Sequence, residues 1–182
     1  MAEIRIRNTE ERIQGEEAVR AFLENQEVLY EHWNPAKLEE GLQQKFVLSD
    51  EEKQQILATY DDEIQDLAAR RGYKTWDIIA LSDATPNLDE LLKKFENVHT
   101  HTEDEVRAIT AGRGIFIIKG TDDVGYFDVE LEAGDVISVP EYKPHFFTLM
   151  DNRQIVAVRL FIETEGWIAH PFADEKFAGS KA

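Results

Sequence analysis

The sequence contains no cysteine. This absence excludes disulfide bonds, zinc sites built from thiolates, and iron–sulfur clusters held by cysteine ligands. Any transition-metal site in this chain must therefore be built from histidine and carboxylate side chains.

Positive charge is scarce as well. The chain has 20 lysines and arginines against 37 acidic residues, which gives a formal net charge of −17. Because a surface this negative repels phosphate backbones, we expect no nucleic-acid partner. Repulsion between copies of the chain also favours a monomer.

Long apolar segments are missing too. No run of apolar residues approaches the ~18 that a membrane-spanning helix needs. The stretch 1–7 also lacks the apolar core of a signal peptide. We therefore expect a cytoplasmic protein with no membrane partner.

What the sequence does contain is enough apolar material for one globular domain. Hydrophobic residues make up 42% of its 182 residues, which suffices for a sizeable single core and is short for two domains. We expect a single domain over 1–182, in which helical and strand elements in about 1–95 pack on a barrel core of about 96–165.

The first part of the chain mixes strands with helices. Alternation over 1–7 predicts an edge strand, and Asn8 with Glu11 predicts a helix cap directly after it. Ser49-Asp50-Glu51-Glu52 has the pattern of a capping box, which opens a long helix that Gly72 ends. Further elements are expected as a strand near 27–33, a buried strand at 76–81 and a short helix over 88–95.

From about residue 99 to residue 162, short strands alternate with turns. The strands are expected at 106–110, 115–119, 126–132, 136–139, 146–150 and 155–162. The turns between them are expected at 112–114, 120–125, 134–135 and 151–152. This spacing predicts a mainly β fold with peripheral helices, in which a sandwich or barrel has its own interior. The stretch 166–172 is expected to pack back on that core.

Histidine and glutamate gather where these strands begin. Because side chains alternate along an extended strand, His99, His101 and Glu105 can point the same way, and His145 arrives from a later strand. Three imidazole nitrogens and a carboxylate oxygen suit a first-row divalent ion such as iron, nickel, manganese or zinc, with two octahedral positions left open. Spacing alone leaves Glu103 as an alternative ligand, because it has the same parity as Glu105.

Two motifs carry a resemblance to known proteins. They run from His99 through Glu105 to Gly112, and from Gly134 through Pro140 to His145, and together they resemble the two barrel motifs of the cupin superfamily. The chain resembles the acireductone dioxygenase family in particular. That resemblance rests on Gly72-Tyr73-x-x-Trp76-Asp77, His99 to Arg107, Gly134 to Pro140, Arg159-x-Phe161 and Gly166-Trp167-Ile168-Ala169.

The resemblance implies a cupin-type β-barrel (a double-stranded β-helix, or jelly roll) that holds one Fe2+ or Ni2+ per chain. It implies His99, His101, Glu105 and His145 as metal ligands, and so favours Glu105 over Glu103. The implied enzyme of methionine salvage cleaves acireductone (1,2-dihydroxy-3-keto-5-methylthiopentene) with O2. The implied products are 4-methylthio-2-oxobutanoate and formate with Fe2+, or methylthiopropionate, formate and CO with Ni2+.

Two arginines leave alternatives open. Arg107 either faces the ligands, where its charge stabilises an anionic enediolate as a catalytic residue, or forms an ion pair at the surface. Arg159 interrupts an apolar strand, where a buried charge needs a partner. It therefore pairs with a carboxylate or faces the substrate pocket. The resemblance implies that this pocket is also lined by Phe95, Phe147 and Trp167.

The resemblance has departures. Ala108 stands where the family commonly has an aromatic residue, and we expect this change to alter the packing of the pocket wall. His32 and His170 lie outside both motifs and are expected to be structural.

Two other interpretations remain open. One is a different metal-dependent cupin enzyme, such as another dioxygenase or a sugar isomerase, and the segments Glu103 to Arg107 and Gly166 to Ala169 argue against it. The other is a non-catalytic ligand-binding cupin, which the complete set of four metal ligands disfavours.

Overall fold

One long strand connects the two sheets of the molecule. In the computed structural model, which describes residues 2–163 and 168–172, this strand is β6, Glu105–Lys119. Its first part pairs with β8 and β10, and its last part pairs with β7 and β9. These partners are β7 (Tyr126–Glu132), β8 (Asp135–Val139), β9 (His145–Leu149) and β10 (Ile155–Phe161).

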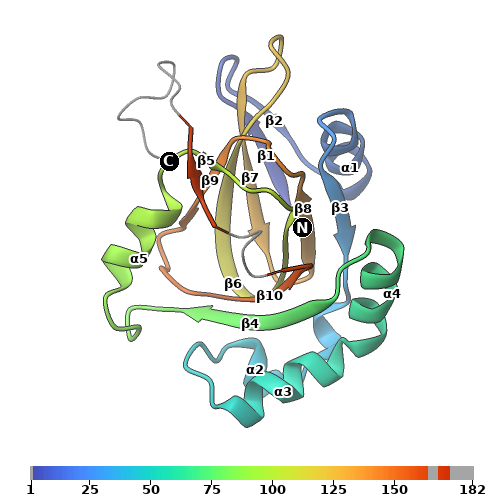
Figure 1. Cartoon of the computed structure of the whole chain (residues 1–182), viewed down its shortest axis with the longest axis vertical. Coiled ribbons are helices and arrows are strands. Elements are labelled where there is room, and N and C mark those ends of the chain that lie inside the picture. Colours follow the sequence, from blue (N-terminus) through green and yellow to red (C-terminus); the bar gives the residue numbers. More distant parts are fainter. Residues whose placement is uncertain (1, 164–167, 173–182) are drawn as a thin grey trace.

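Shorter strands extend both sheets around β6 (Figure 1). One sheet has the order β11-β5-β9-β6-β7-β1-β2, and the other adds β3 beside β8 and β4 beside β10. The bounds are β1 Glu3–Ile6, β2 Glu11–Ile13, β3 Leu29–His32, β4 Thr75–Leu81, β5 His99–Thr100 and β11 His170–Pro171. The predicted mainly β fold is confirmed. The first 95 residues contribute β1, β2, β3 and β4 to the sheets, in addition to the helices that pack on them.

Helices lie along the outside of the barrel. They are α1 Glu16–Asn25, η1 Pro35–Lys37, α2 Glu40–Gln43, α3 Asp50–Thr59, α4 Asp61–Arg71 and α5 Leu88–Phe95. The capping box is confirmed, because Glu52 N donates to Ser49 Oγ and Ser49 N donates to Glu52 Oε1. In the described part of the chain, no helix is long and apolar enough to cross a membrane.

The expected long helix is divided in two. At Tyr60, which separates α3 from α4, the backbone has φ −104° and ψ 18°. The Tyr60 side chain is buried against Trp33, and its hydroxyl donates to the carbonyl of Asn34 at 2.9 Å. Gly72 ends α4 in the left-handed conformation, as predicted.

Two local predictions near the N-terminus were wrong. No helix starts at Asn8, because residues 7–10 form a turn and β2 folds back on β1 through the Ile4–Ile13 pairing. Helix α1 begins only after Gly15, whose φ is 95°. As a result β1 lies between β7 and β2 and is not an edge strand.

The turn predicted at 112–114 was also wrong, because β6 continues through it. Gly112 has φ 77°, and a Cβ at this position would lie 2.1 Å from the carbonyl oxygen of Gln154. The pairing of β6 with β10 shifts register near this point. Glycine therefore bends the strand from one sheet into the other and does not end it.

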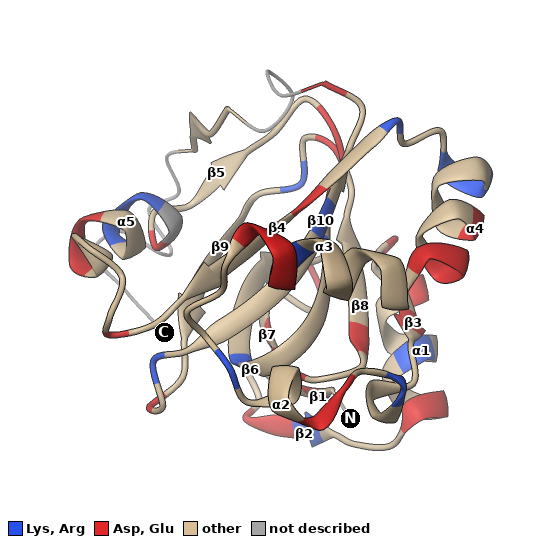
Figure 2. Cartoon of the chain, turned by 90° about the horizontal axis from the view of Figure 1, so that it is seen from below, with Lys and Arg blue, Asp and Glu red and all other residues tan. Residues whose placement is uncertain are grey.

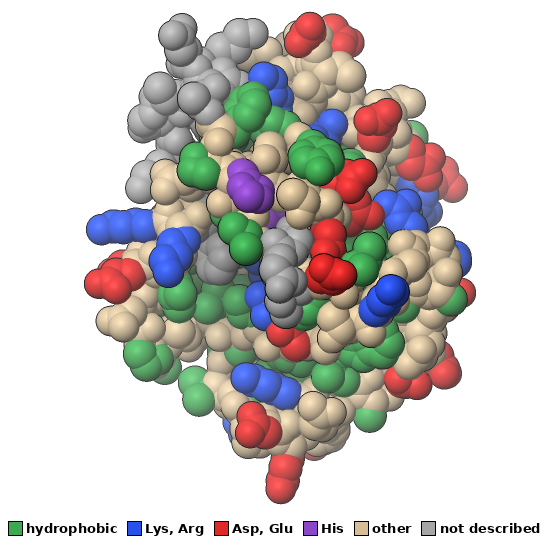
Figure 3. All heavy atoms as spheres, in the orientation of Figure 1, with side chains coloured by type: hydrophobic (Ala, Val, Ile, Leu, Met, Phe, Trp, Pro, Cys, Tyr) green, Lys and Arg blue, Asp and Glu red, His purple; other side chains and the backbone are tan. Residues whose placement is uncertain are grey.

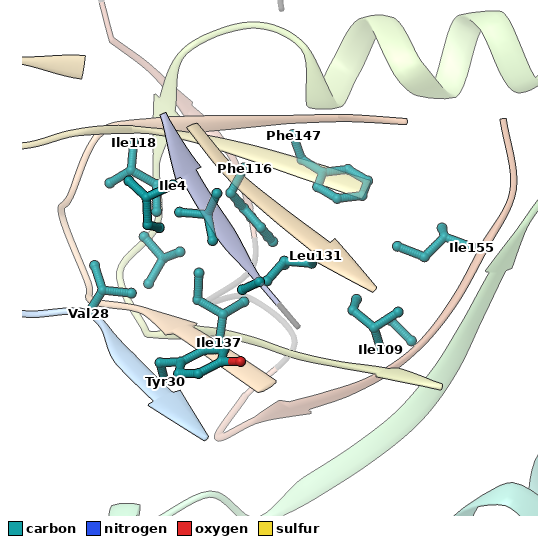
Figure 4. Packing of buried hydrophobic residues seen from close by; sticks show 14 of the residues in the cluster. Ile4, Val28, Tyr30, Ile109, Phe116, Ile118, Leu131, Ile137, Phe147 and Ile155 are labelled. Carbon is teal, nitrogen blue, oxygen red and sulfur yellow. The ribbon is translucent and has the colours of Figure 1, made fainter. Parts of the chain in front are cut away.

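Two hydrophobic clusters lie on opposite faces of the sheet that contains β4 and β10. The inner cluster fills the barrel and includes Ile109, Phe116, Ile137 and Phe147 (Figure 4). The outer cluster packs strand residues against α3 and α4, and it includes Val106, Ala108, Val158, Ile56 and Ile64. Full burial of a valine, isoleucine or phenylalanine side chain in these clusters contributes about 1.5–3 kcal/mol. Because Ala108 lies on the outer face, the expectation that it shapes the pocket wall was wrong.

Candidate metal centre

The four predicted ligands meet at one end of the barrel. His99 lies in β5, His101 follows it, Glu105 begins β6 and His145 begins β9. One ligand atom from each residue lies within 4.8 Å of the other three, and all four side chains are buried. On the face drawn in Figure 3, histidine atoms are visible just above the centre.

Backbone carbonyls orient all three imidazoles. Each Nδ1 lies within hydrogen-bond distance of a carbonyl oxygen, which can only accept, so each Nδ1 must carry the proton. The acceptors for His99, His101 and His145 are the carbonyls of Asn97 (2.6 Å), Ile168 (3.1 Å) and Lys143 (2.8 Å). This arrangement fixes the tautomers and directs the Nε2 atoms to the shared point, as metal-binding histidines require.

The charges at this point fit a divalent cation. Burial raises the pKa of Glu105, but the adjacent His145 and Arg107 outweigh it and hold that pKa well below its usual range. Burial, reinforced by the charge of His145, lowers the pKa of His99 to about 4, so His99 is neutral at pH 7. Three imidazole nitrogens and one carboxylate are a suitable donor set for one first-row divalent ion.

Metal affinity is expected to fall as the pH is lowered. A histidine binds a metal only when its ligand nitrogen is deprotonated, and burial lowers the pKa of His99 to about 4. We therefore expect His99 to keep its ligand nitrogen free at pH 7 and to lose the metal to a proton as the pH approaches 4. Metal affinity measured by titration calorimetry over this range checks the result, and equal affinity at pH 7 and pH 4 would contradict it.

Glu103, the alternative ligand, points elsewhere. Its carboxylate accepts hydrogen bonds from the backbone N–H groups of Ile162 (2.7 Å) and Glu163 (3.0 Å). The next residue, Asp104, accepts from the Tyr73 hydroxyl at 2.7 Å. Of these three consecutive acids, Glu105 alone contributes an oxygen to the ligand cluster. The other two tie neighbouring segments to the strand that carries it.

Arg107 lies beside the ligand cluster inside the barrel. Its side chain is 1% exposed, Nε donates to Glu105 Oε1 at 3.1 Å, and Nη2 lies 3.0 Å from the same oxygen. The guanidinium carbon is 5.0 Å from the centre of the Phe147 ring. The surface ion pair considered for Arg107 is therefore excluded, because its charge is buried next to a metal ligand.

The structure describes part of the predicted pocket wall. Phe147 is buried in the inner cluster, 5.0 Å between ring centres from Phe116. Sequence reasoning missed Phe116, whose ring centre is also 5.9 Å from that of His145. The β6–β9 register places Phe116 opposite Phe147, and no residue pattern in the sequence indicates that register. The side chain of Phe95 and the whole of Trp167 lie outside the described residues, so both stay predictions.

The remaining candidates are not part of the ligand cluster. Arg159 donates through Nε and Nη2 to the two carboxylate oxygens of Asp77, at 2.8 and 2.6 Å. His32 lies in β3, and His170 is exposed in β11. Within residues 2–163 and 168–172, neither histidine joins the metal cluster.

A family model matches almost the whole chain. It is that of the ARD/ARD' family, and it covers residues 3–169. The chain belongs to the ARD/ARD' family. Within this family, it is similar to the acireductone dioxygenase of Geobacillus kaustophilus, with 71% identity over 98% of this chain and 99% of the relative. The acireductone dioxygenase of Geobacillus thermodenitrificans is 70% identical, over 99% and 100% of the two chains.

A solved structure supports the same membership in the ARD/ARD' family. It is that of an acireductone dioxygenase from Bacillus anthracis with a cadmium ion in its active centre. It superimposes with a TM-score of 0.90 at 54% identity, covering 93% of this chain and 97% of that one. An ion bound in that protein agrees with the single metal that the donor set of this ARD-family chain can hold.

Proposed function

We propose that this protein is an acireductone dioxygenase of methionine salvage, which cleaves 1,2-dihydroxy-3-keto-5-methylthiopentene with O2. The observation that carries the proposal is the buried cluster of three oriented imidazoles and one carboxylate, with Arg107 at its side. Relatives that share this enzyme name at 70–71% identity support the same activity.

We propose His99, His101, Glu105 and His145 as the ligands of one Fe2+ or Ni2+ ion per chain. A bound ion of this kind supplies Lewis acidity and redox chemistry toward an enediolate and dioxygen. Each ligand is also oriented by a hydrogen bond to a group outside the metal site. The histidines are held through their Nδ1 atoms, and Glu105 is held through Arg107.

Arg107 is proposed as the residue that binds the anionic substrate and stabilises charge on its oxygen atoms. Its guanidinium stays protonated even when buried, so its charge is permanent. The rings of Phe116 and Phe147 lie 5.9 and 5.0 Å from the guanidinium carbon, and the arginine is buried. In such surroundings an oriented positive charge acts more strongly than in water, and its position needs no reorganisation during the reaction.

The proposal has a direct test in metal exchange. Apoprotein loaded with Fe2+ should convert acireductone and O2 to formate and 4-methylthio-2-oxobutanoate without CO. The Ni2+ form should give formate, methylthiopropionate and CO. The reason is that the chain offers identical donors to both ions, so any difference in products must come from the ion. The measurement mixes anaerobic acireductone with O2 and quantifies gas and acids for each form.

The controls test the substrate assignment separately from the effect of the metal on the products. Oxygen uptake no faster than the spontaneous oxidation with either ion would reject the acireductone assignment. Identical products from both forms would leave the dioxygenase in place and reject the control of product by the metal. Apoprotein without added metal serves as the blank.

We also propose that the enzyme acts as a cytoplasmic monomer, with the small substrate and O2 as its partners. The support for a monomer is the net charge of −17. Acidic residues lie along α1, α3 and α4 (Figure 2), so copies of the chain repel one another there.

A further inference from the structure

A row of three charged side chains crosses the sheet next to the metal centre. In the antiparallel register, Arg159 of β10 lies opposite Arg107 of β6 on one side and opposite Asp77 of β4 on the other. Residues directly opposite in neighbouring strands point to the same face of a sheet. The three side chains therefore share one face.

That face is the inner face of the barrel. Two residues further along β6 and β10, Ile109 and Ala157 lie opposite each other, and both belong to the inner cluster. On β4, Ile79 is paired with Ala157 and packs against the same cluster. The structure thus gives Arg159 a carboxylate partner, and its place on the barrel-facing side supports the second alternative, that it faces the substrate pocket.

The row runs from the buried site toward solvent. The side-chain exposure is 1% for Arg107, 27% for Arg159 and 43% for Asp77. An anion that reaches Arg107 along this face passes Arg159 first. The Gly72-Tyr73-x-x-Trp76-Asp77 motif, which has no role at the metal itself, places its aspartate at the outer end of this row.

Asp77 has two effects on Arg159. It binds both Nε and Nη2, a bidentate geometry that fixes the plane of the guanidinium and directs Nη1 away from the carboxylate. It also offsets one of two positive charges that face each other across β6 and β10, where like charges repel. Without Asp77, the repulsion from Arg107 would turn the partly exposed guanidinium of Arg159 outward to water.

We propose that Asp77 is a positioning residue for substrate binding, which holds the Arg159 guanidinium on the path of the anionic substrate. This inference rests on the proposed function. Arg159 contacts the substrate anion, and Asp77 acts only through Arg159. Asp77→Asn removes the charge while keeping the shape, so it should raise KM for acireductone about tenfold and leave kcat within about threefold, the scale of one charge-assisted hydrogen bond.

A double-mutant cycle tests whether Asp77 acts through Arg159. Asp77→Asn, Arg159→Ala and the double variant are each loaded with Fe2+, and KM and kcat are measured by oxygen uptake. We expect the KM of the double variant to match that of Arg159→Ala, because Asp77 has nothing left to position. Asp77→Glu, which keeps a carboxylate, should recover part of the lost affinity. Additive effects on KM, or no recovery by Asp77→Glu, would overturn the inference.

Matched controls distinguish positioning from stability. Asp66→Asn breaks a comparable exposed pair, Arg70 Nε to Asp66 Oδ2 at 3.0 Å on α4, and should leave KM unchanged. Metal content and Tm of Asp77→Asn should equal those of the wild type. Loss of either would make Asp77 structural and overturn the inference. If the wild type is active and Asp77→Asn has a normal KM, only this inference is rejected. If the wild type is inactive, the proposed function is rejected as well.

Discussion

Alanine at His99, His101 or His145 is expected to remove most of the bound metal and all turnover of acireductone. Each change deletes one of four donors from a buried site whose remaining donors cannot move inward, because carbonyls hold their Nδ1 atoms. Loss of an outer partner of a ligand alone costs ~10–100-fold in metal affinity, and loss of the ligand itself should exceed that. Metal per chain after dialysis, measured by elemental analysis, checks the result.

The neighbouring acids provide a matched control. Glu105→Ala should lose metal as the histidine variants do. Glu103→Ala should keep it, because that carboxylate binds the backbone N–H groups of Ile162 and Glu163. Full occupancy in all three histidine variants, or metal loss in Glu103→Ala alone, would contradict the ligand assignment.

Arg107→Ala is expected to keep its metal and lose turnover by about two to three orders of magnitude, the scale for removing one oriented group that stabilises developing charge. The bound ion still neutralises the negative charge of Glu105 when Arg107 is removed, so the variant should fold normally. Arg107→Lys should recover little activity, since an ammonium cannot reproduce the planar fork that contacts Glu105 through Nε and Nη2. Steady-state oxygen uptake by the Fe2+ forms gives the rates.

A second arginine serves as the comparison for Arg107. Arg153 is partly exposed and pairs with Asp83 and Asp89 at the surface. Arg153→Ala should therefore retain normal turnover, since exposed ion pairs contribute little. If Arg107→Ala were equally active, its burial beside Glu105 would have no role in catalysis.

Most strands could be predicted because they depend on local spacing, and the ligand set could be predicted because the family motifs contain it. Alternation along one extended segment does not explain the placement of His99 and Glu105, because β5 ends at Thr100 and β6 begins at Glu105, with bends at residues 102 and 103 between them. Spacing could not exclude Glu103, and the structure does so through contacts with residues 59 and 60 positions away. Local pattern alone could not make that distinction.

Other features could not be predicted because distant segments decide them. The Gly112 region has the composition of a turn, yet β10 approaches it so closely that β6 must continue as a bent strand. Asn8 has the pattern of a helix cap, yet pairing with β1 draws the following residues into β2. The partner of Arg159 depended on which strand lies beside β10, and that strand comes from the first half of the chain.

The central position of β6 has a consequence for the order of folding. Its hairpin with β7 forms between neighbouring segments, whereas its pairings with β9 and β10 close much longer loops, such as the one that sets Arg107 opposite Arg159. Proteins dominated by such distant pairings fold in about milliseconds to seconds. The metal ligands come from β6, from β9 and from the β5 segment. We therefore expect the newly made chain to close its barrel slowly, and to acquire its ion only after these late contacts have formed.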